Sequence, residues 1–425
     1  MKVAVVKESA PFERRVALVP DAVSKLTGAG WVVAVEPGAG QAAQYADADY
    51  ISAGATVDKA ALKNADAALS VQPLTPAQVG QLRKSAVAIS FLQPAAASDT
   101  VRAHMKAGTT ALSLDLLPRI SRAQSMDALS SQALVSGYRC AILAAERLPK
   151  LFPLMMTAAG TIPPAKVLVM GAGVAGLQAI ATARRLGAVV EAYDVRAAAA
   201  EEVRSLGATF VELELETQEG AGGYAKEQTE EFLTKQRELI GNRVELADVV
   251  ITTAAIPGRT APVLVTLDMV KRMKPGSIVI DLAAESGGNV EPSRPGEDVR
   301  VGSVTVIGAR NMPSAMAVHA SALYSRNCVN LLLLLTKDGA LAPDYEDEIV
   351  VGAAVVKQGE LVHGPTKEIL GASTTTRRSP AKKAATTKSP ATKSPAKQTP
   401  AKKTTATKSP AKKTPAKKTA ARRAS

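Results

Sequence analysis

The chain has 425 residues, 46% of them hydrophobic, and a formal net charge of +13. Residues 373–425 hold 16 of the 52 Lys and Arg residues and none of the 39 acidic residues, so the preceding 372 residues carry a net charge of −3. This distribution predicts a mildly acidic body, long enough for two domains, with a strongly basic tail. Apolar runs such as Leu331–Leu335 are far shorter than the ~20 residues that cross a bilayer, and the first residues, MKVAVVKES, lack the pattern of a signal peptide. We therefore expect a soluble body.

Cysteine and histidine usage argues against a disulfide framework and a metal site. The only two cysteines, Cys140 and Cys328, lie in apolar helical patterns, which predicts buried reduced thiols. His104, His319 and His363 are scattered without the spacing of metal ligands, so we expect no bound metal.

Residues 1 to about 125 alternate short apolar runs with helical patterns. This rhythm predicts a parallel sheet covered by helices, and a long helix is expected from Ser125 to Leu148. The predicted strands are Val3–Val6, Trp31–Val35, Ala67–Val71, Ala86–Leu92 and Thr110–Leu114, and an early helix is predicted at Asp21–Leu26.

A glycine-rich unit follows. An apolar strand, Val167–Met170, runs into Gly171, Gly173 and Gly176 at the spacing G-x-G-x-x-G, and then into a predicted helix, Val174–Leu186. The three glycines suit a tight turn, a bare backbone that a pyrophosphate can approach, and a close contact between helix and strand. The N–H groups at the start of the helix would face the phosphates. The unit predicts a dinucleotide site that includes Ala172 and Val174.

Asp194 ends the next predicted strand, 18 residues after Gly176. A carboxylate there can accept hydrogen bonds from both hydroxyls of the adenosine ribose and would repel a 2′-phosphate. The sequence therefore favours NAD(H) over NADP(H). A glycine turn that serves only packing is the alternative.

The second half of the body continues the same rhythm, and a helix predicted at Met316–Thr336 would return the chain to the first domain. The stretch Gly220–Lys226 contains Tyr224 and is either an ordinary surface loop or a lid over the cofactor. Further strands are predicted at Thr209–Glu212, Asp248–Thr252, Ser277–Asp281 and Val304–Ile307.

The composition changes after Gly371. No aromatic or branched aliphatic residue occurs from Ser373 onward, so we expect disorder there, with attraction to nucleic acid or an anionic membrane, or a solvated tail without a fixed partner. Ser/Thr-Pro-Ala-Lys starts at Ser379, Ser394, Thr399, Ser409 and Thr414, and Ser-Pro-Ala-Thr at Ser389.

The predicted fold class is α/β, with two Rossmann-like doubly wound parallel-sheet domains separated by a cleft. We expect an outer domain at residues 1–128, a dinucleotide-binding domain at 129–312, the rest of the outer domain at 313–372 and the tail at 373–425.

Several stretches besides the glycine turn are specific enough to indicate a family. They are Pro118-RISRAQSMDALSSQ-Ala133, Met156-TAAGTIPPAKVLVMGAGVAGLQAIATA-Arg184, Ala221-GGYAKE-Gln228, Thr252-TAAIPGRTAPVL-Val265 and Gly276-SIVIDLAAESGG-Asn289. Over roughly residues 1 to 370 the chain resembles the NAD(H)-binding component of proton-translocating nicotinamide nucleotide transhydrogenases. Alanine dehydrogenase is the related family with the same two-domain plan.

The resemblance implies roles for individual residues. The family's signature loop near the nicotinamide matches Arg119, Gln124, Asp127 and Ser130, which would hold the carboxamide and ribose so that C4 faces a second nucleotide. From the residues alone, Arg119 and Asp127 could be an ordinary ion pair. The resemblance also places Tyr224 on a mobile loop that closes over the nucleotide. The resemblance further implies that Thr253 and Ala254 lie beside the bound dinucleotide.

The chain departs from alanine dehydrogenase where that family needs a lysine and a histidine. The corresponding stretches, ALSVQP at 68–73 and SFLQP at 90–94, contain neither residue. Arg15 is retained, while Glu285 stands in place of an aspartate. An arginine without a proton carrier cannot complete amino-acid chemistry, so we expect no significant amination of pyruvate.

The resemblance implies the NAD(H)-binding subunit of a transhydrogenase. NADP(H) would be bound by a partner, and hydride transfer would be coupled to proton movement through the membrane-spanning second polypeptide of the alpha subunit and the beta subunit. We expect a homodimer, without metal, at the cytoplasmic face of a bacterial inner membrane. The alternatives are a soluble NAD-dependent alanine (amino-acid) dehydrogenase and a nucleic-acid-associated protein acting through its tail.

Overall fold

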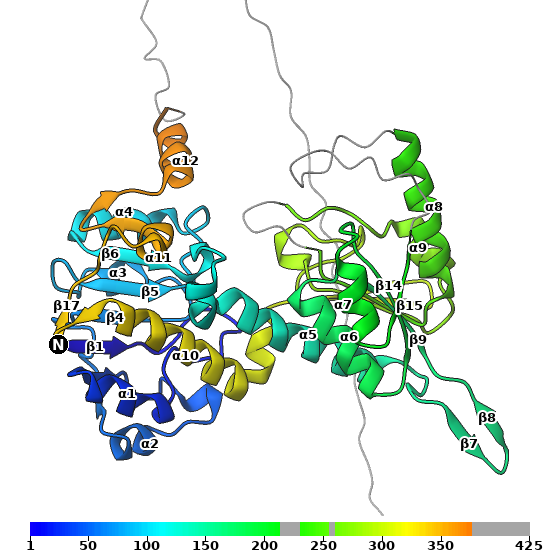
Figure 1. Ribbon diagram of the computed structural model, residues 1–425, viewed down its shortest axis with the longest axis horizontal. Coiled ribbons are helices and arrows are strands. Elements are labelled where there is room, and N and C mark those ends of the chain that lie inside the picture. Colours follow the sequence, from blue (N-terminus) through cyan, green and yellow to red (C-terminus); the bar gives the residue numbers. More distant parts are fainter. Residues whose placement is uncertain (213–229, 255–259, 376–425) are drawn as a thin grey trace, which may run out of the picture. The chain divides into compact units, whose positions relative to one another are not determined.

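The computed structural model describes residues 1–212, 230–254 and 260–375, which belong to one compact unit (Figure 1). Within these ranges no helix has the length and apolar character needed to cross a bilayer. Tyr224 and the stretch 220–226 lie outside the described residues, as does the tail from residue 376 on.

The first sheet has eight strands in the order β19-β18-β6-β5-β4-β1-β2-β3. Its six parallel strands reverse their sequence order between β1 and β4, which is the topological switch point of a doubly wound sheet. The five strands predicted in this region are confirmed. The strands are β1 (Lys2–Val5), β2 (Val32–Val35), β3 (Thr56–Val57), β4 (Ala67–Leu69), β5 (Val87–Ser90), β6 (Thr110–Ser113), β18 (Ala354–Lys357) and β19 (Glu360–Leu361).

Helices surround this sheet, and their ends follow local chemistry. Thr75 and Gln78 form a capping box that starts α3, and Gly108 ends α4 in a left-handed conformation (φ +68°). The elements are η1 (Pro20–Ala22), α1 (Val23–Gly28), η2 (Gln41–Ala43), α2 (Asp47–Ser52), α3 (Pro76–Val79), α4 (Ser98–Ala107), η3 (Leu114–Leu116), η4 (Ser121–Met126), α10 (Ala317–Leu334), α11 (Glu348–Ala353) and α12 (Gly364–Thr375), with a small β16–β17 ribbon (Thr336–Lys337, Ala340–Leu341).

The second sheet has seven strands in the order β11-β10-β9-β12-β13-β15-β14. Its switch point lies between β9 and β12, where ligands of doubly wound sheets usually bind. The strands are β9 (Lys166–Met170), β10 (Val189–Tyr193), β11 (Thr209–Phe210), β12 (Val249–Thr252), β13 (Ile278–Asp281), β14 (Asp298–Val301) and β15 (Val304–Gly308). Around it lie α5 (Ala128–Arg147), α6 (Val174–Arg185), α7 (Ala199–Ser205), α8 (Glu230–Leu246), α9 (Leu267–Arg272), η5 (Ala284–Ser286) and η6 (Met312–Met316).

Several antiparallel features were not predicted from the sequence, among them the β16–β17 ribbon. β14 pairs antiparallel with β15, and β18 pairs antiparallel with both β6 and β19. β7 (Met155–Thr157) and β8 (Gly160–Ile162) form a hairpin that extends away from the sheet (Figure 1). β7, β8 and β14 are wholly or partly exposed, so they lack the continuous apolar runs that mark buried parallel strands. β18 is mostly buried, and no strand was predicted there. The predicted fold class, two α/β domains on parallel sheets, is otherwise confirmed.

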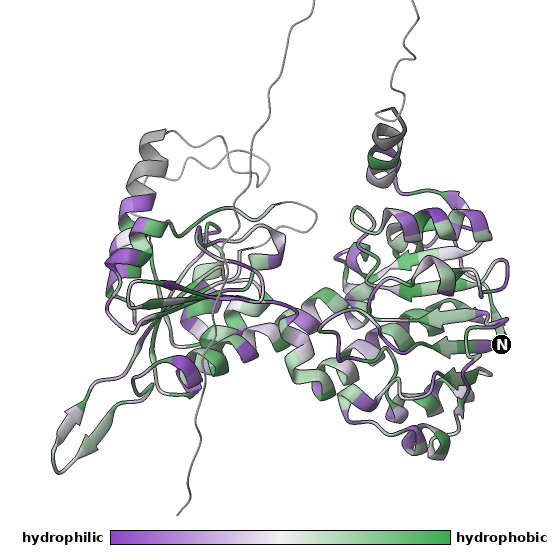
Figure 2. Cartoon of the chain, turned by 180° about the vertical axis from the view of Figure 1, so that it is seen from behind, coloured by the Kyte–Doolittle hydropathy of each residue, from purple (hydrophilic) through white to green (hydrophobic). Residues whose placement is uncertain are grey.

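Helix α5 contributes to two hydrophobic cores. Ala128 packs in the core of the first sheet, whereas Cys140 and Ala144 pack in the core of the second. Cys328 of α10 lies in the first core, and both cysteines are buried and free, as predicted. Figure 2 shows hydrophobic residues concentrated in the strands of the first sheet and hydrophilic ones gathered on the surrounding helices and loops. Burial of these apolar strand faces is the main driving force for the fold.

A buried ion pair fixes the loop after β1. Glu13 accepts hydrogen bonds from Arg15 Nε at 2.8 Å and Nη2 at 2.7 Å, and both side chains are almost fully buried. Arg15 also donates to Gln132 of α5 at 2.9 Å and to Asn311, just before η6, at 3.3 Å. Burial opposes ionisation of Glu13, but the bonds and charge of Arg15 outweigh it and lower the pKa to about 2.

Replacing Glu13 with Gln should destabilise the protein by about 3–5 kcal/mol at pH 7, because it leaves a buried guanidinium without its counter-charge. The folded pKa of about 2 lies below the ordinary 4.5. The advantage of the wild type is therefore complete above pH 4.5 and is lost as the pH falls toward 2. Urea unfolding of both proteins across this range measures it, with the exposed Glu360→Gln as control. A gap that stays constant with pH would contradict the assignment.

Candidate functional site

The glycine turn lies at the switch point of the second sheet, between β9 and α6. Gly171 has φ +102°, a conformation that favours glycine, and its N–H bonds to the carbonyl of Tyr193 at 2.8 Å. Gly173 is the N-cap of α6, so the first N–H groups of a 12-residue helix point toward the turn. Val174, the first helical residue, is 42% exposed.

A hypothetical Cβ distinguishes the three glycines. At Gly176 it would lie 1.8 Å from the carbonyl oxygen of Gly171, and at Gly171 it would lie 2.6 Å from Thr253 Oγ1. At Gly173 it would meet no protein atom within 4 Å. Two of the glycines are therefore required by packing, and the third borders open space. That opening beside helix N–H groups fits a pyrophosphate.

Asp194 lies at the carboxyl end of β10, beside the turn. Its Oδ2 accepts the N–H of Ala172 at 2.7 Å, and Arg196 donates to both carboxylate oxygens, from Nε to Oδ1 at 3.1 Å and from Nη2 to Oδ2 at 3.2 Å. The side chain of Asp194 is only 7% exposed, while that of Arg196 is 61% exposed. Burial opposes ionisation of Asp194, but hydrogen bonds from Arg196 and Ala172 outweigh it and lower the pKa. The carboxylate is thus ionised at neutral pH and held against the turn.

Thr253 and Ala254 follow β12, directly across the switch point. Thr253 donates through Oγ1 to the carbonyl of Gly171 at 2.9 Å. The side-chain amide of the buried Asn289 holds Ala254: Oδ1 accepts its N–H at 3.0 Å, and Nδ2 donates to its carbonyl at 2.8 Å and to that of Pro262 at 2.8 Å. The structure therefore brings Gly171, Asp194, Thr253 and Ala254 to one edge of the sheet.

The loop before α5 contains the other predicted site residues. Asp127 is the N-cap of α5, and its carboxylate accepts the N–H of Ser130 at 2.9 Å and its hydroxyl at 2.5 Å. Among the described residues Arg119 has no ion-pair partner, so the ordinary Arg119–Asp127 ion pair considered from the sequence does not form. Asp127 and Ser130 instead act on each other and fix the start of the helix.

Arg119 and Gln124 are two of the exposed polar side chains of this loop, and within the described ranges of the chain neither side chain makes a hydrogen bond. The residues between and beside them are anchored: Ala123 and Met126 are buried in the first core, and Arg122 binds Asp347 through two bonds of 2.6 and 2.8 Å. The loop thus presents the side chains of Arg119 and Gln124, without hydrogen bonds to the described residues, on a fixed backbone.

The stretches that lack the lysine and histidine lie at the carboxyl edge of the first sheet. Gln72 follows β4 and donates to Glu13 at 2.8 Å, and Gln93 follows β5, where its N–H bonds to Asp115 at 2.6 Å. A small cavity beside Gln72 is also lined by Glu8, whose pKa burial raises to about 8 although backbone N–H groups oppose this. Glu285 accepts the N–H of Asn311 at 2.8 Å.

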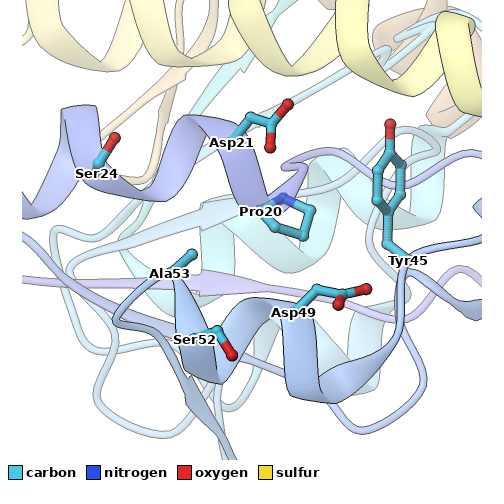
Figure 3. A pocket seen from close by; sticks show the side chains of 7 residues that line it. All are labelled: Pro20, Asp21, Ser24, Tyr45, Asp49, Ser52 and Ala53. Atoms are coloured by element: carbon cyan, nitrogen blue, oxygen red, sulfur yellow. The ribbon is translucent and has the colours of Figure 1, made fainter.

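A depression between η1–α1 and α2 is lined by Asp21 and Asp49 together with Tyr45, whose hydroxyl donates to the carbonyl of Val318 at 3.3 Å (Figure 3). Its two carboxylates would repel phosphate groups. It contains none of the predicted site residues and does not fit a dinucleotide.

The residues whose side chains hold the backbone of the candidate site were not predicted from the sequence. Asn289 appeared in the sequence only as the last residue of a family motif, and no role was predicted for Asn327 and Asn330 of α10. The side-chain amides of Asn327 and Asn330 both donate to the carbonyl of Ser125 at 3.0 Å. Asn327, which is buried within a largely apolar helix, was the available signal, because such side chains require a hydrogen-bond partner.

Two family models match the chain. The alanine dehydrogenase/PNT N-terminal domain matches residues 4–136, and the C-terminal domain of the same family matches residues 140–364. A relative from Rhodospirillum rubrum, the first of the numbered parts of an NAD(P) transhydrogenase subunit alpha, is 48% identical over 376 residues, covering 85% of this chain and 98% of the relative. The chain belongs to the alanine dehydrogenase/PNT family and, within it, to the transhydrogenase alpha subunits.

Other proteins are also similar to this chain in sequence or in structure. An alanine dehydrogenase from Mycobacterium tuberculosis is 32% identical over 302 residues, covering 69% of this chain and 76% of the relative. The crystal structure of a transhydrogenase from Sinorhizobium meliloti has a TM-score of 0.79 at 46% identity, covering 85% of this chain and all of that one. An L-alanine dehydrogenase structure has a TM-score of 0.73 at 26% identity, covering 88% and 99% of the two chains. The family accounts for the fold and for an oxidoreductase that uses nicotinamide nucleotides.

Substitutions in the glycine turn should distinguish its contribution to nucleotide binding from its contribution to folding. Gly173→Ala should lower the free energy of unfolding by only about 1 kcal/mol, the cost of placing Ala, a poorer N-cap than Gly, at the start of α6, yet weaken NADH binding by about tenfold or more. Gly176→Ala should destabilise the domain, because its Cβ would overlap the carbonyl of Gly171. Urea unfolding and NADH fluorescence titration of both variants measure the two effects. Equal loss of stability in the two variants would remove Gly173 from the proposed pyrophosphate site.

Proposed function

We propose that this chain is the NAD(H)-binding subunit of a proton-translocating transhydrogenase, which passes hydride between NADH and NADP⁺ held by a partner subunit. The observation that carries the proposal is the opening above Gly173, flanked by the carboxylate of Asp194. The opening would hold the pyrophosphate, and Asp194 would accept the ribose hydroxyls. When bound, the nicotinamide ring supplies the hydride chemistry.

NAD(H) is favoured because the carboxylate at the ribose position is buried, ionised and oriented. A 2′-phosphate would meet the negative charge of Asp194, and the neighbouring Arg196 is engaged by that carboxylate. The second nucleotide, NADP(H), therefore requires another chain. Relatives that are 42–48% identical to this chain are named as the alpha subunit, or a part of the alpha subunit, of NAD(P) transhydrogenase. Their names support a multi-subunit assembly for this chain.

Alanine dehydrogenase activity is not favoured for this chain. Gln72 and Gln93 occupy the stretches where that chemistry needs lysine and histidine, and neither amide can carry a proton at neutral pH. The donors of Arg15 are already engaged by Glu13, Gln132 and Asn311. Incubation of the purified chain with pyruvate, ammonia and NADH tests this alternative directly, and turnover of NADH would support it.

In the proposed reaction the protein positions the nucleotide and excludes water, because hydride transfer between two nicotinamides needs no proton from the chain. Arg119 and Gln124, whose side chains make no hydrogen bond to the described residues, would orient the carboxamide and ribose of NADH. Asp127 and Ser130, bonded to each other, would hold the backbone of that loop and complete the polar site. Tyr224 would contribute from outside the described residues.

Partners follow from the same proposal. The membrane-spanning second polypeptide of the alpha subunit and the beta subunit would carry the proton, and this chain would be peripheral at the cytoplasmic face of a bacterial inner membrane. A second copy would cover the apolar side chains of the β7–β8 hairpin, where Met156 is 79% exposed, because an isolated two-stranded hairpin is only marginally stable. The basic tail would contact anionic lipid or nucleic acid non-specifically. Co-purification from membranes and sedimentation of the isolated chain test these contacts.

Asp194→Ser should reverse the nucleotide preference. Loss of the charged acceptor should weaken NADH binding by roughly 10–100-fold, as expected for about 1.5–3 kcal/mol, while the released Arg196 should strengthen binding of NADPH. Fluorescence titration with both nucleotides measures this. The control is Glu191→Gln on the same strand, whose carboxylate pairs with Arg243 and should leave both affinities unchanged. Tighter binding of NADPH than NADH by the wild type would refute the assignment of Asp194.

Gln124→Asn should slow hydride transfer in the complex with the membrane subunits by about tenfold or more at saturating NADH and leave the NADH dissociation constant nearly intact. The shorter side chain loses contacts that orient the ring but contributes little to holding the nucleotide. Absence of hydride transfer in the wild-type complex would refute the proposed function. A large loss of NADH affinity in the variant would show instead that Gln124 only builds the pocket.

A further inference from the structure

The carbonyl of Ser125 has an unusual set of partners. It accepts hydrogen bonds from two side-chain amides, Asn327 Nδ2 and Asn330 Nδ2, each at 3.0 Å. The two asparagines are three residues apart on α10, so they share one face of that helix. Ser125 belongs to η4, directly after Gln124 and two residues before Asp127. Two donors from a distant helix thus converge on one backbone atom of the site loop.

Asn327 also links this loop to the rest of the first core. Its Oδ1 accepts the hydroxyl of Ser131 at 2.8 Å, and the amide of Gln132 donates to Ser131 Oγ at 3.2 Å. Gln132 in turn accepts a hydrogen bond from the buried Arg15. A continuous set of hydrogen bonds therefore runs from the Glu13–Arg15 ion pair to the loop, and the amide of Asn327 uses both its oxygen and its nitrogen.

The burial of the two asparagines differs in a useful way. Asn327 is 6% exposed, and its neighbours Cys328 and Val329 are packed in the first core. Burying an amide among such residues is costly unless its polar atoms are paired. Asn330 is only partly buried, so its replacement removes one donor with little change in packing. Neither amide has any of the glycine-turn residues among its hydrogen-bond partners within the described chain.

We propose that Asn327 and Asn330 are positioning residues for hydride transfer: by holding the Ser125 carbonyl from α10, they set the backbone from which Gln124 reaches the nicotinamide. The inference rests on the proposed function. Because both amides hold the same oxygen, either one alone should keep the loop in place, and loss of both should release it. The two substitutions should therefore be strongly coupled.

The test uses Asn330→Ala, Asn327→Ala, the double variant and, as matched control, Arg326→Ala on the exposed side of the same helix. Hydride transfer in the complex with the membrane subunits should fall about two- to threefold in each single variant. In the double variant it should fall roughly tenfold more than the product of the singles. The NADH dissociation constant of the isolated chain should stay within about twofold, and Arg326→Ala should match the wild type.

Amide hydrogen exchange of residues 121–131 in the isolated chain gives a readout independent of activity. Exchange there should be faster in the double variant and unchanged in the control, while the rest of the chain keeps its protection. A double variant that shows only the product of the single effects, with unchanged exchange, would overturn the inference. An equal effect of Arg326→Ala would also overturn it.

Two further outcomes are informative. If Asn327→Ala does not fold, Asn330→Ala decides alone: a rate of hydride transfer equal to that of Arg326→Ala would overturn the inference. If the wild-type complex transfers no hydride, the proposed function fails, but local exchange in 121–131 still decides whether the two asparagines hold the loop.

Discussion

The close contact between α5 and α6 is the constraint on which the site depends. A Cβ on Gly137 of α5 would lie 2.0 Å from the carbonyl oxygen of Ala175, in the first turn of α6. Helix α6 begins at the glycine turn, and α5 begins at Asp127, at the end of the loop that presents Gln124. Helix α5 therefore connects the loop of Gln124 to the glycine turn, the two parts of the candidate site, and only glycine permits its backbone to approach α6 so closely.

The two ends of α5 are stabilised by different means. Its start is held by polar contacts: the cap from Asp127, the bond between Ser131 and Asn327, and the bond between Gln132 and Arg15. Its second half is held by apolar packing, with Cys140 and Ala144 in the core of the second sheet. Hydrogen bonds have strict geometry, whereas apolar packing is less directional. The chain thus uses its directional contacts where side chains must be oriented and its less directional ones where the helix must only be retained.

The parallel framework was predictable because its strands are continuous apolar runs, and the glycine turn because each glycine has a distinct steric role. Gly171, Gly173 and Asp194 could be placed together from their order along the chain, whereas Thr253 was placed there only by the family resemblance. The partners of Ser125 could not, because they join residues about 200 positions apart and no local pattern reports such a contact. The hairpin β7–β8 was missed because its side chains are exposed on both faces and lack the alternation of a half-buried strand.

The positions of the two cysteines make each of them a probe of one hydrophobic core. Cys140 lies in the core of the second sheet and Cys328 in that of the first, and both are fully buried. Burial raises the pKa of the Cys140 thiol to about 12 and that of Cys328 well above its ordinary value, so neither forms the reactive thiolate in the native state. A thiol reagent can reach each one only when its own core opens. The chain therefore carries one chemical reporter of local opening in each of its two cores, without any engineered label.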